Sequence, residues 1–149
     1  MTTAAGEQGP RALVRRPLGG HSDAVTTTSP SAPAAPVFGP GPATLVVDGS
    51  PVAAVAVART RTERRTGLLG SSGVDGALWI TRCGAVHTVG MTYPLEVAFL
   101  DRRGRCTAVR TMPPGRWSRP RLRARSTLEA EVGSFAAWGL AAGSVVSTA

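Results

Sequence analysis

The stretch LEVAFL-DRRG-RCTAVRTM, residues 95–112, decides the fold because it is the clearest β-hairpin in the chain. Two strand-like runs, 95–100 and 105–112, flank a polar turn in which Gly104 is suited to a positive φ. Side chains in the first run should alternate between two faces of a sheet. One face would carry Leu95, Val97 and Phe99, and the other Glu96, Ala98 and Leu100.

A second hairpin is expected upstream, where the runs 45–47 and 51–58 are separated by Asp48-Gly49-Ser50. Asp-Gly between apolar runs is a strong signal for a two-residue hairpin turn. Further short strands are expected at 77–80, 87–91, 126–132 and 145–146.

Helix signals are few. Thr60 followed by Glu63 forms a capping box, which predicts a helix over 61–69 that ends at Gly70 and buries Leu68 and Leu69. Ser134 can cap one more short helical turn, over 134–138. Many short strands with few helices favour a mainly β fold, an antiparallel sandwich or barrel-like domain. A doubly wound α/β fold needs several crossover helices and does not fit.

The first part of the chain differs from the rest in composition. Residues 1–43 hold seven of the twelve prolines, with Gly, Ser, Thr and Ala between them. Such a segment buries too little apolar surface to offset the entropy of ordering it. We therefore expect a disordered tail over 1–43 and a single β-rich domain over 44–149.

The net charge is +8, and all seventeen basic residues are arginine. Codon usage in a GC-rich genome explains the preference for arginine most simply, but the charge still favours an anionic ligand or an acidic protein as partner. Arginines and Pro17 interrupt every apolar run near the N-terminus, so the pattern of a signal peptide is missing. The longest apolar run, 52–58, is far too short to span a membrane. A cytoplasmic protein is expected.

Three segments together resemble the family catalogued as domain of unknown function 192. They are 57–69 with its ERRTGLL sequence, 86–109 with HTVGMTYPLEVAFLDRRG, and 127–143 with TLEAEVG followed by WGL and a glycine. Val89, Glu96 and Ser144 depart from that family's usual aromatic, Asp and Asp. The resemblance implies a β-rich, sandwich-like fold. It implies no catalytic residue, because the family's activity is not established.

The residues around the 93–94 turn form a candidate binding pocket, which consists of Cys83, His87, Met91, Tyr93 and Glu96. A carboxylate on an apolar strand must find hydrogen-bond donors or be exposed. Glu96 could bind a ligand, or it could brace the turn through a hydrogen bond to the 90–91 backbone or to the His87 ring. The leading interpretation is a small binding or accessory domain.

An enzyme is the alternative, because Cys83 and His87 are four residues apart and could act as nucleophile and base with Glu96 or Asp101 as orienting group. No nucleophile elbow or thiol-enzyme signature accompanies them, and the default interpretation of Cys83 is a buried free thiol, with a bridge to Cys106 as the minor alternative. A metal would find at most three mixed ligands and no C-x-x-C or H-x-x-x-H. We therefore expect no metal, no cofactor and no assigned catalytic residue.

A second candidate surface lies in 115–125, which is basic and has no acidic residue. If this piece is extended, alternate arginines project from one side and suit phosphates or carboxylates, with Trp117 available for stacking. The alternative is a solvated loop that protects a sheet edge. No recognition helix, RNA-binding aromatic pair or zinc finger points to sequence-specific recognition of nucleic acid. The candidate anion-binding residues are Arg116, Arg119, Arg121, Arg123 and Arg125.

Overall fold

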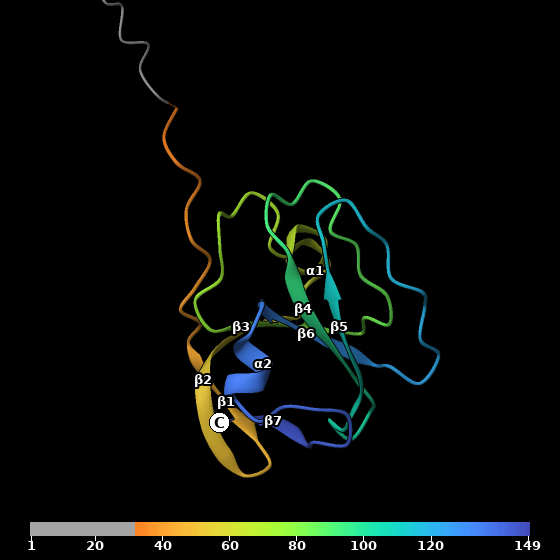
Figure 1. Cartoon of the computed structure of the whole chain (residues 1–149). Coiled ribbons are helices and arrows are strands. Elements are labelled where there is room, and N and C mark those ends of the chain that lie inside the picture. Colours follow the sequence, from red (N-terminus) through yellow and green to blue (C-terminus); the bar gives the residue numbers. More distant parts are fainter. Residues whose placement is uncertain (1–31) are drawn as a thin grey trace, which may run out of the picture. The chain divides into compact units, whose positions relative to one another are not determined.

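The computed structural model describes residues 32–149, which form one curled, seven-stranded sheet with two short helices (Figure 1). The strand order across the sheet is β5-β4-β6-β3-β2-β1-β7. The expected class, a mainly β, barrel-like domain, is confirmed. The elements are β1 Ala43–Val47, β2 Ser50–Ala58, α1 Arg61–Thr66, β3 Ala77–Thr81, β4 Leu95–Leu100, β5 Cys106–Met112, β6 Ser126–Glu131, α2 Ser134–Ala137 and β7 Val146–Thr148.

The two edges of the sheet meet at one end, which gives the domain the form of a half-barrel (Figure 1). Arg105 and Val145 form an antiparallel bridge between the start of β5 and the residue before β7. The Cys106 N–H donates to the Ser144 carbonyl at 2.8 Å, and the Val146 N–H donates to the Gly104 carbonyl at 2.9 Å. These bonds pair backbone groups that an open sheet edge would leave unpaired.

Both hairpins form as expected. The β1–β2 turn has positive φ at Asp48 (47°) and Gly49 (85°), as a tight hairpin turn requires. In the β4–β5 turn, the Asp101 carboxylate accepts the N–H groups of Arg103 at 2.8 Å and Arg105 at 3.0 Å. Every strand pair is antiparallel except β2–β3, which is parallel with Val55 opposite Ala77. The expected antiparallel arrangement is wrong there, because α1 and the loop after it carry the chain across before β3 begins.

Helix α1 begins where the sequence predicts. The Glu63 N–H donates to the Thr60 hydroxyl at 3.2 Å, and the Glu63 carboxylate accepts the Thr60 N–H at 2.9 Å, which completes the capping box. The expected end at Gly70 is wrong, because Gly67 leaves the helical conformation with φ 48°. Leu68 is buried as expected, whereas Leu69 is 39% exposed.

The strand expected over 87–91 does not form. His87 makes a single bridge to Trp117, and the Met91 N–H then donates to the Thr88 carbonyl at 3.1 Å in a turn. Gly90, with φ 85°, allows that turn. The segment is a loop whose backbone pairs with another loop.

Most of the tail expected over 1–43 lies outside the described residues. Within the described part, Phe38 already pairs with Val74, and its N–H donates to the Gly73 carbonyl at 2.9 Å. Phe38 also packs against the apolar core. Contacts with the domain therefore begin a few residues before the expected boundary at 44.

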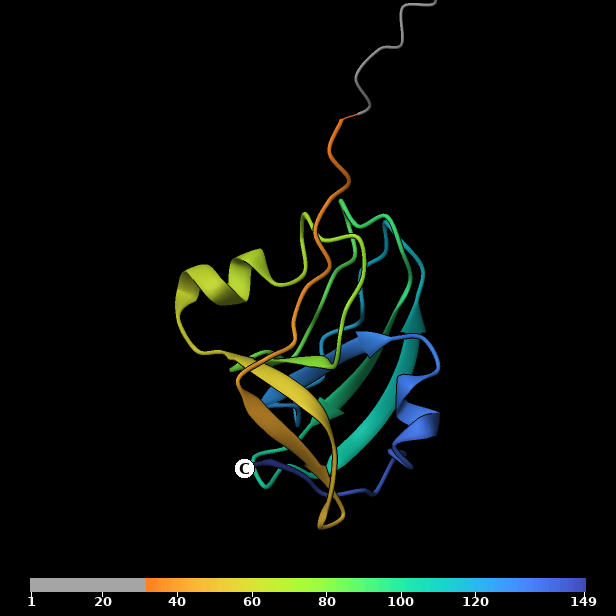
Figure 2. The ribbon, with the colours of Figure 1, turned by 90° about the vertical axis from the view of Figure 1, so that its left-hand side faces the viewer.

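Apolar residues cover both faces of the sheet and form two clusters. Figure 2 shows the sheet between α1, in yellow-green, and α2, in blue. We call the two clusters the helix-side cluster, which contains Phe135 of α2, and the loop-side cluster, which lies under the long connections. The expected alternation along β4 is confirmed, since Leu95, Val97 and Phe99 belong to the loop-side cluster and Ala98 and Leu100 to the helix-side cluster. Both candidate surfaces lie on the loop side, with the exception of Glu96, which faces the helix side.

Candidate functional site

A basic loop, residues 113–125, which we call the arginine loop, is fastened to the loop at 86–88. The Thr88 N–H donates to the Arg116 carbonyl at 2.8 Å, and the Gly115 N–H donates to the Thr88 carbonyl at 2.9 Å. The Thr88 hydroxyl donates to the Pro113 carbonyl at 2.6 Å and accepts the Arg116 N–H at 2.9 Å. Thr88 is 1% exposed, so these bonds are shielded from water and hold the loop firmly.

The next residues continue the same attachment. The Ser118 N–H donates to the Val86 carbonyl at 2.8 Å, and the Ser118 hydroxyl accepts the Val86 N–H at 2.9 Å. Between these bonds the His87 and Trp117 rings lie 4.6 Å apart, centroid to centroid, at 39°. Trp117 remains 73% exposed, so it presents an aromatic surface to solvent while His87 supports its position.

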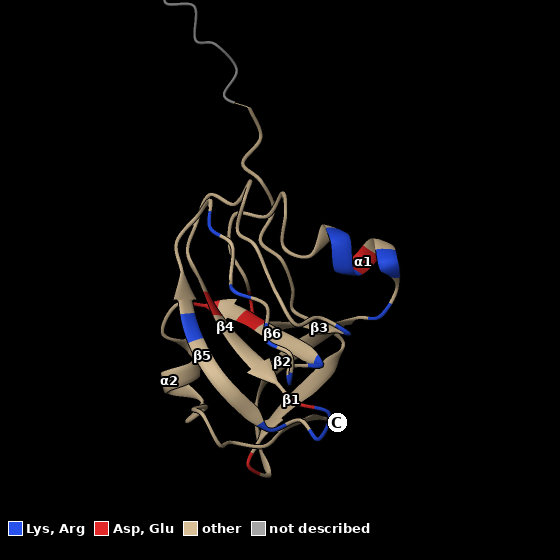
Figure 3. Cartoon of the chain, turned by 90° about the vertical axis from the view of Figure 1, so that its right-hand side faces the viewer, with Lys and Arg blue, Asp and Glu red and all other residues tan. Residues whose placement is uncertain are grey.

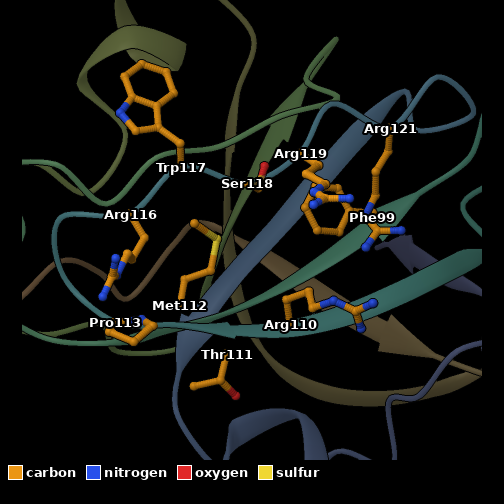
Figure 4. A pocket seen from close by; sticks show the side chains of 10 residues that line it. All are labelled: Phe99, Arg110, Thr111, Met112, Pro113, Arg116, Trp117, Ser118, Arg119 and Arg121. Carbon is orange, nitrogen blue, oxygen red and sulfur yellow. The ribbon is translucent and has the colours of Figure 1, made fainter.

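The arginine loop and β5 enclose an open groove of about 560 Å³ (Figure 4). Trp117 and Arg116 lie at one end of the groove, and Phe99, Arg119 and Arg121 lie at the other. The lining contains four arginines and no acidic residue. It consists of Phe99, Arg110, Thr111, Met112, Pro113, Arg116, Trp117, Ser118, Arg119 and Arg121.

The candidate anion-binding arginines do not form one extended row. The Ala124 N–H donates to the Arg121 carbonyl at 3.0 Å, so the chain turns after Arg121 and takes Arg123 and Arg125 out of the groove lining. Arg121 itself is fixed, because its guanidinium carbon lies 4.7 Å from the centre of the Phe99 ring. Arg110 of β5 takes part instead. Sequence reasoning missed it because only the folded hairpin brings it to this loop.

The candidate pocket is only partly assembled. Cys83, His87 and Met91 line one cleft of about 80 Å³ beside α1, which we call the Glu129 cleft after the carboxyl group in its lining. Tyr93 is not in its lining, and its hydroxyl lies 2.6 Å from the Ser71 hydroxyl oxygen. Glu96 faces the other side of the sheet, where its carboxylate accepts the Phe135 N–H at 3.0 Å. It therefore braces α2 and neither the 93–94 turn nor His87.

Cys83 and His87 share a cleft, but they are not arranged as a nucleophile and base. The Cys83 thiol donates to the Ala85 carbonyl at 3.0 Å, not to the imidazole. Among residues 32–149, no group of three or more His, Cys, Asp or Glu side chains is placed to hold a metal ion. Both cysteines are free thiols, and burial raises the pKa of the Cys106 thiol.

Sequence reasoning did not single out Glu129, the acidic group of the cleft. It lies in the middle of β6, opposite Leu78 of β3 and Val97 of β4, and is only 6% exposed. Burial raises the pKa of its carboxyl from 4.5 to about 7. The sequence did carry a signal, because a glutamate between Leu128 and Ala130 interrupts the apolar centre of a strand. Figure 3 shows the acidic positions on β6 and the basic ones on β5 and α1.

Comparison with known proteins places this domain in a family of small β domains to which no activity is assigned. Residues 43–148 match the model of the DUF192 family, described as "Uncharacterized ACR", and the chain belongs to that family. No curated protein matches. In the described part of the chain, none of the helices has the length and apolar character needed to cross a membrane.

Two solved structures share the fold. One, a protein of unknown function from Novosphingobium aromaticivorans, has 18% sequence identity and a TM-score of 0.62, over 77% of this chain and 94% of that one. The other, from Sinorhizobium meliloti, is described as "a putative transcription regulator". It has 19% identity and a TM-score of 0.54, over 63% of this chain and 80% of that one. These likenesses support the fold alone.

Proposed function

We propose that this domain is a cytoplasmic module that binds single-stranded nucleic acid in the groove between β5 and the arginine loop. The observation that carries the proposal is the composition of that groove, in which four arginines and an exposed tryptophan surround an apolar floor and no acidic residue takes part. The two free thiols are consistent with a reducing compartment.

The chemistry of the groove suits a nucleotide in two ways. Arginine guanidinium groups form charge-assisted hydrogen bonds with phosphate oxygens, often in pairs. A base stacked on an exposed aromatic ring contributes about 1–3 kcal/mol, whatever its sequence. Trp117 is 73% exposed and lies next to Arg116, so a base and its phosphate can be bound together.

The rigidity of the arginine loop adds to the argument. Thr88 and Ser118 hold the loop by partly buried hydrogen bonds, and His87 supports the Trp117 ring. A preorganised site loses less conformational entropy when the ligand binds. The Sinorhizobium meliloti structure, which shares the fold, is described as "a putative transcription regulator", and that description belongs to that protein.

Binding has more support than catalysis by Cys83 and His87. A thiol nucleophile needs a base within hydrogen-bond reach, and the Cys83 thiol instead donates to a backbone carbonyl. Glu96, the expected orienting group, lies on the opposite face of the sheet. Cys83→Ser should therefore leave binding to the groove unchanged.

Salt titration tests the proposal. The affinity for a fluorescein-labelled ten-nucleotide poly(rA) should be measured by fluorescence anisotropy from 20 to about 200 mM salt, a range in which phosphate contacts weaken steeply. Each arginine that contacts phosphate contributes about 0.7 to the slope of log K against log [salt] for single strands. The double variant Arg110→Gln/Arg119→Gln should lower the slope by about 1.4. The matched control Arg103→Gln/Arg123→Gln removes the same charge outside the groove and should leave the slope nearly unchanged.

A second variant and a second ligand decide between a strand and a free nucleotide. Trp117→Ala should weaken poly(rA) binding about tenfold or more without changing the salt slope, because it removes stacking and no charge. AMP should compete only weakly. Equal effects of the two double variants would show nonspecific attraction to the net charge of the chain, and AMP binding as tight as that of poly(rA) would overturn the single-strand assignment.

A further inference from the structure

The Glu129 cleft contains a buried carboxyl group that nothing in the described protein satisfies. Glu129 is 6% exposed, and no residue between 32 and 149 donates a hydrogen bond or forms an ion pair with it. Burial is the one cause of the shift in its pKa. A buried, unpartnered carboxyl is costly, and proteins commonly keep one only where it has a use.

The cleft also contains space. Its volume is about 80 Å³, several times the 10–15 Å³ that a single water molecule needs by a comparable measure. Its walls combine apolar side chains with two arginines of α1. Among the wall residues are Leu68, Ile80, Val86, Met91 and Leu95, together with Arg64 and Arg65.

We propose that the Glu129 cleft binds a primary ammonium group on a slender alkyl stem, with the Glu129 carboxylate as its counter-ion. Three N–H donors of an ammonium group can reach both carboxylate oxygens from several directions. The methylene groups of the stem would then lie against Met91 and Leu95. A guanidinium group is planar and wider, which suits so small a cleft less well.

The charges around Glu129 define the ligand further. Arg64 and Arg65 place positive charge in the same lining, so a second cationic end on the ligand would be repelled there and an anionic end attracted. The cleft therefore favours an ω-amino acid over a diamine. The chain contains no lysine, so another copy of it offers no lysine side chain as the ligand.

Affinity should depend on pH because the carboxyl must ionise before it can pair with a cation. With a pKa of about 7, the ionised fraction rises roughly tenfold between pH 6 and pH 8, while an alkylamine stays protonated. The binding constant should rise by about the same factor. His87 also lines the cleft, so the variant His87→Asn shows whether that ring contributes to the pH dependence of binding. The other titratable or charged groups near the cleft are Arg64, Arg65, Cys83, Tyr93 and Glu131.

The experiment is calorimetric titration of the full-length protein with n-butylamine, 5-aminopentanoate and 1,5-diaminopentane at pH 6, 7 and 8. We expect 5-aminopentanoate to bind most tightly and the diamine most weakly. Glu129→Gln keeps the shape of the side chain and removes its charge, and should weaken binding at pH 8 at least tenfold. The matched control is Glu131→Gln, which changes an exposed glutamate two residues further along the same strand and should weaken binding much less than Glu129→Gln does.

A third variant tests the cavity independently of the charge. Met91→Phe narrows the cleft without touching the carboxyl and should also abolish binding, and circular dichroism shows whether each variant is folded. No binding of any amine to the wild type at pH 8, equal binding by the Glu129→Gln variant, or an affinity that does not change between pH 6 and 8 would each overturn the proposal. The groove and its nucleic-acid assay use other residues, so these outcomes leave the proposed function to be judged separately.

Discussion

Glu96 and Glu129 lie on neighbouring strands of the same sheet, yet their surroundings are opposite. In the register of β4 and β6, Glu96 is opposite Ala130, and Glu129 is opposite the next residue, Val97. Because side chains alternate, the two carboxyl groups point to different faces. Glu96 is half-buried on the helix side and accepts the Phe135 N–H at 3.0 Å, whereas Glu129 is buried on the loop side without a donor.

The comparison separates a structural acid from a candidate ligand-binding one. The N-cap residue of α2 is Gly133, which has no side chain to accept an N–H of the first turn. The Glu96 carboxylate takes that place, because it accepts the Phe135 N–H. A carboxyl that faces a cleft without a partner contributes nothing comparable to the fold. An acidic residue is available to a ligand when its carboxyl group has no hydrogen-bond donor within the protein, and burial alone does not indicate this.

The largest expected effect is on the pH dependence of stability. Folding raises the pKa of Glu129 from 4.5 to about 7, so the folded protein holds this proton more tightly than the unfolded chain does. The stability that the neutral carboxyl contributes is complete below pH 4.5 and is lost as the pH rises through 7. Relative to Glu129→Gln, the wild type should lose about 2–3 kcal/mol of unfolding free energy between pH 5 and pH 8. Urea denaturation at both pH values measures it.

Glu131→Gln serves as the control for that measurement, since it changes an exposed glutamate on the same strand. Its unfolding free energy should follow the wild type across the same pH range. If Glu129→Gln also followed the wild type, Glu129 would have a donor in solution, and the contrast with Glu96 would disappear.

A smaller effect is expected from Glu96. Glu96→Ala removes the acceptor of the Phe135 N–H and should lower the unfolding free energy by about 1–2 kcal/mol, as the loss of a helix cap does. Glu96→Asp shortens the side chain by one methylene group and should fall between the wild type and Ala. Urea denaturation at pH 7 measures both. A loss no larger than that of Glu131→Ala would mean that the bond to α2 contributes nothing to stability.

The same contrast explains which parts of the molecule could be predicted. Hairpin turns and the capping box at Thr60 are local, so short stretches of sequence determine them. The partner of Glu96 comes from a segment 39 residues further along the chain, and the attachment of Thr88 to the arginine loop spans 25–28 residues. Such pairings depend on how the strands order themselves, which residue patterns alone do not encode.

The groove and the cleft illustrate this limit. The sequence indicated the arginine-rich segment and the cysteine–histidine pair. The groove lining, however, includes Arg110 of β5 and excludes Arg123, because the chain turns after Arg121. Glu129 could have been noticed, because a glutamate flanked by Leu128 and Ala130 in a strand with few polar neighbours needs a reason. The face it points to follows from the register of three strands, which only the structure supplies.

The smallest expected effect sharpens the comparison at Thr127, which lies two residues before Glu129 on the same face of β6. Thr127 is 0% exposed, and its hydroxyl oxygen has no hydrogen-bond partner among the described residues. Thr127→Val keeps the shape of the side chain and removes an unsatisfied polar group, so it should raise the unfolding free energy by about 0.5–1 kcal/mol.

Thr81→Val is the control, and its unfolding free energy should change in the opposite direction. The Thr81 hydroxyl donates to the Ala58 carbonyl at 2.9 Å, and its loss should cost about 1 kcal/mol. Thermal or urea denaturation of the two variants beside the wild type measures both changes. If Thr127→Val were as destabilising as Thr81→Val, the Thr127 hydroxyl would have a partner in solution, such as a bound water molecule, and the loop side of β6 would be better satisfied than its geometry indicates.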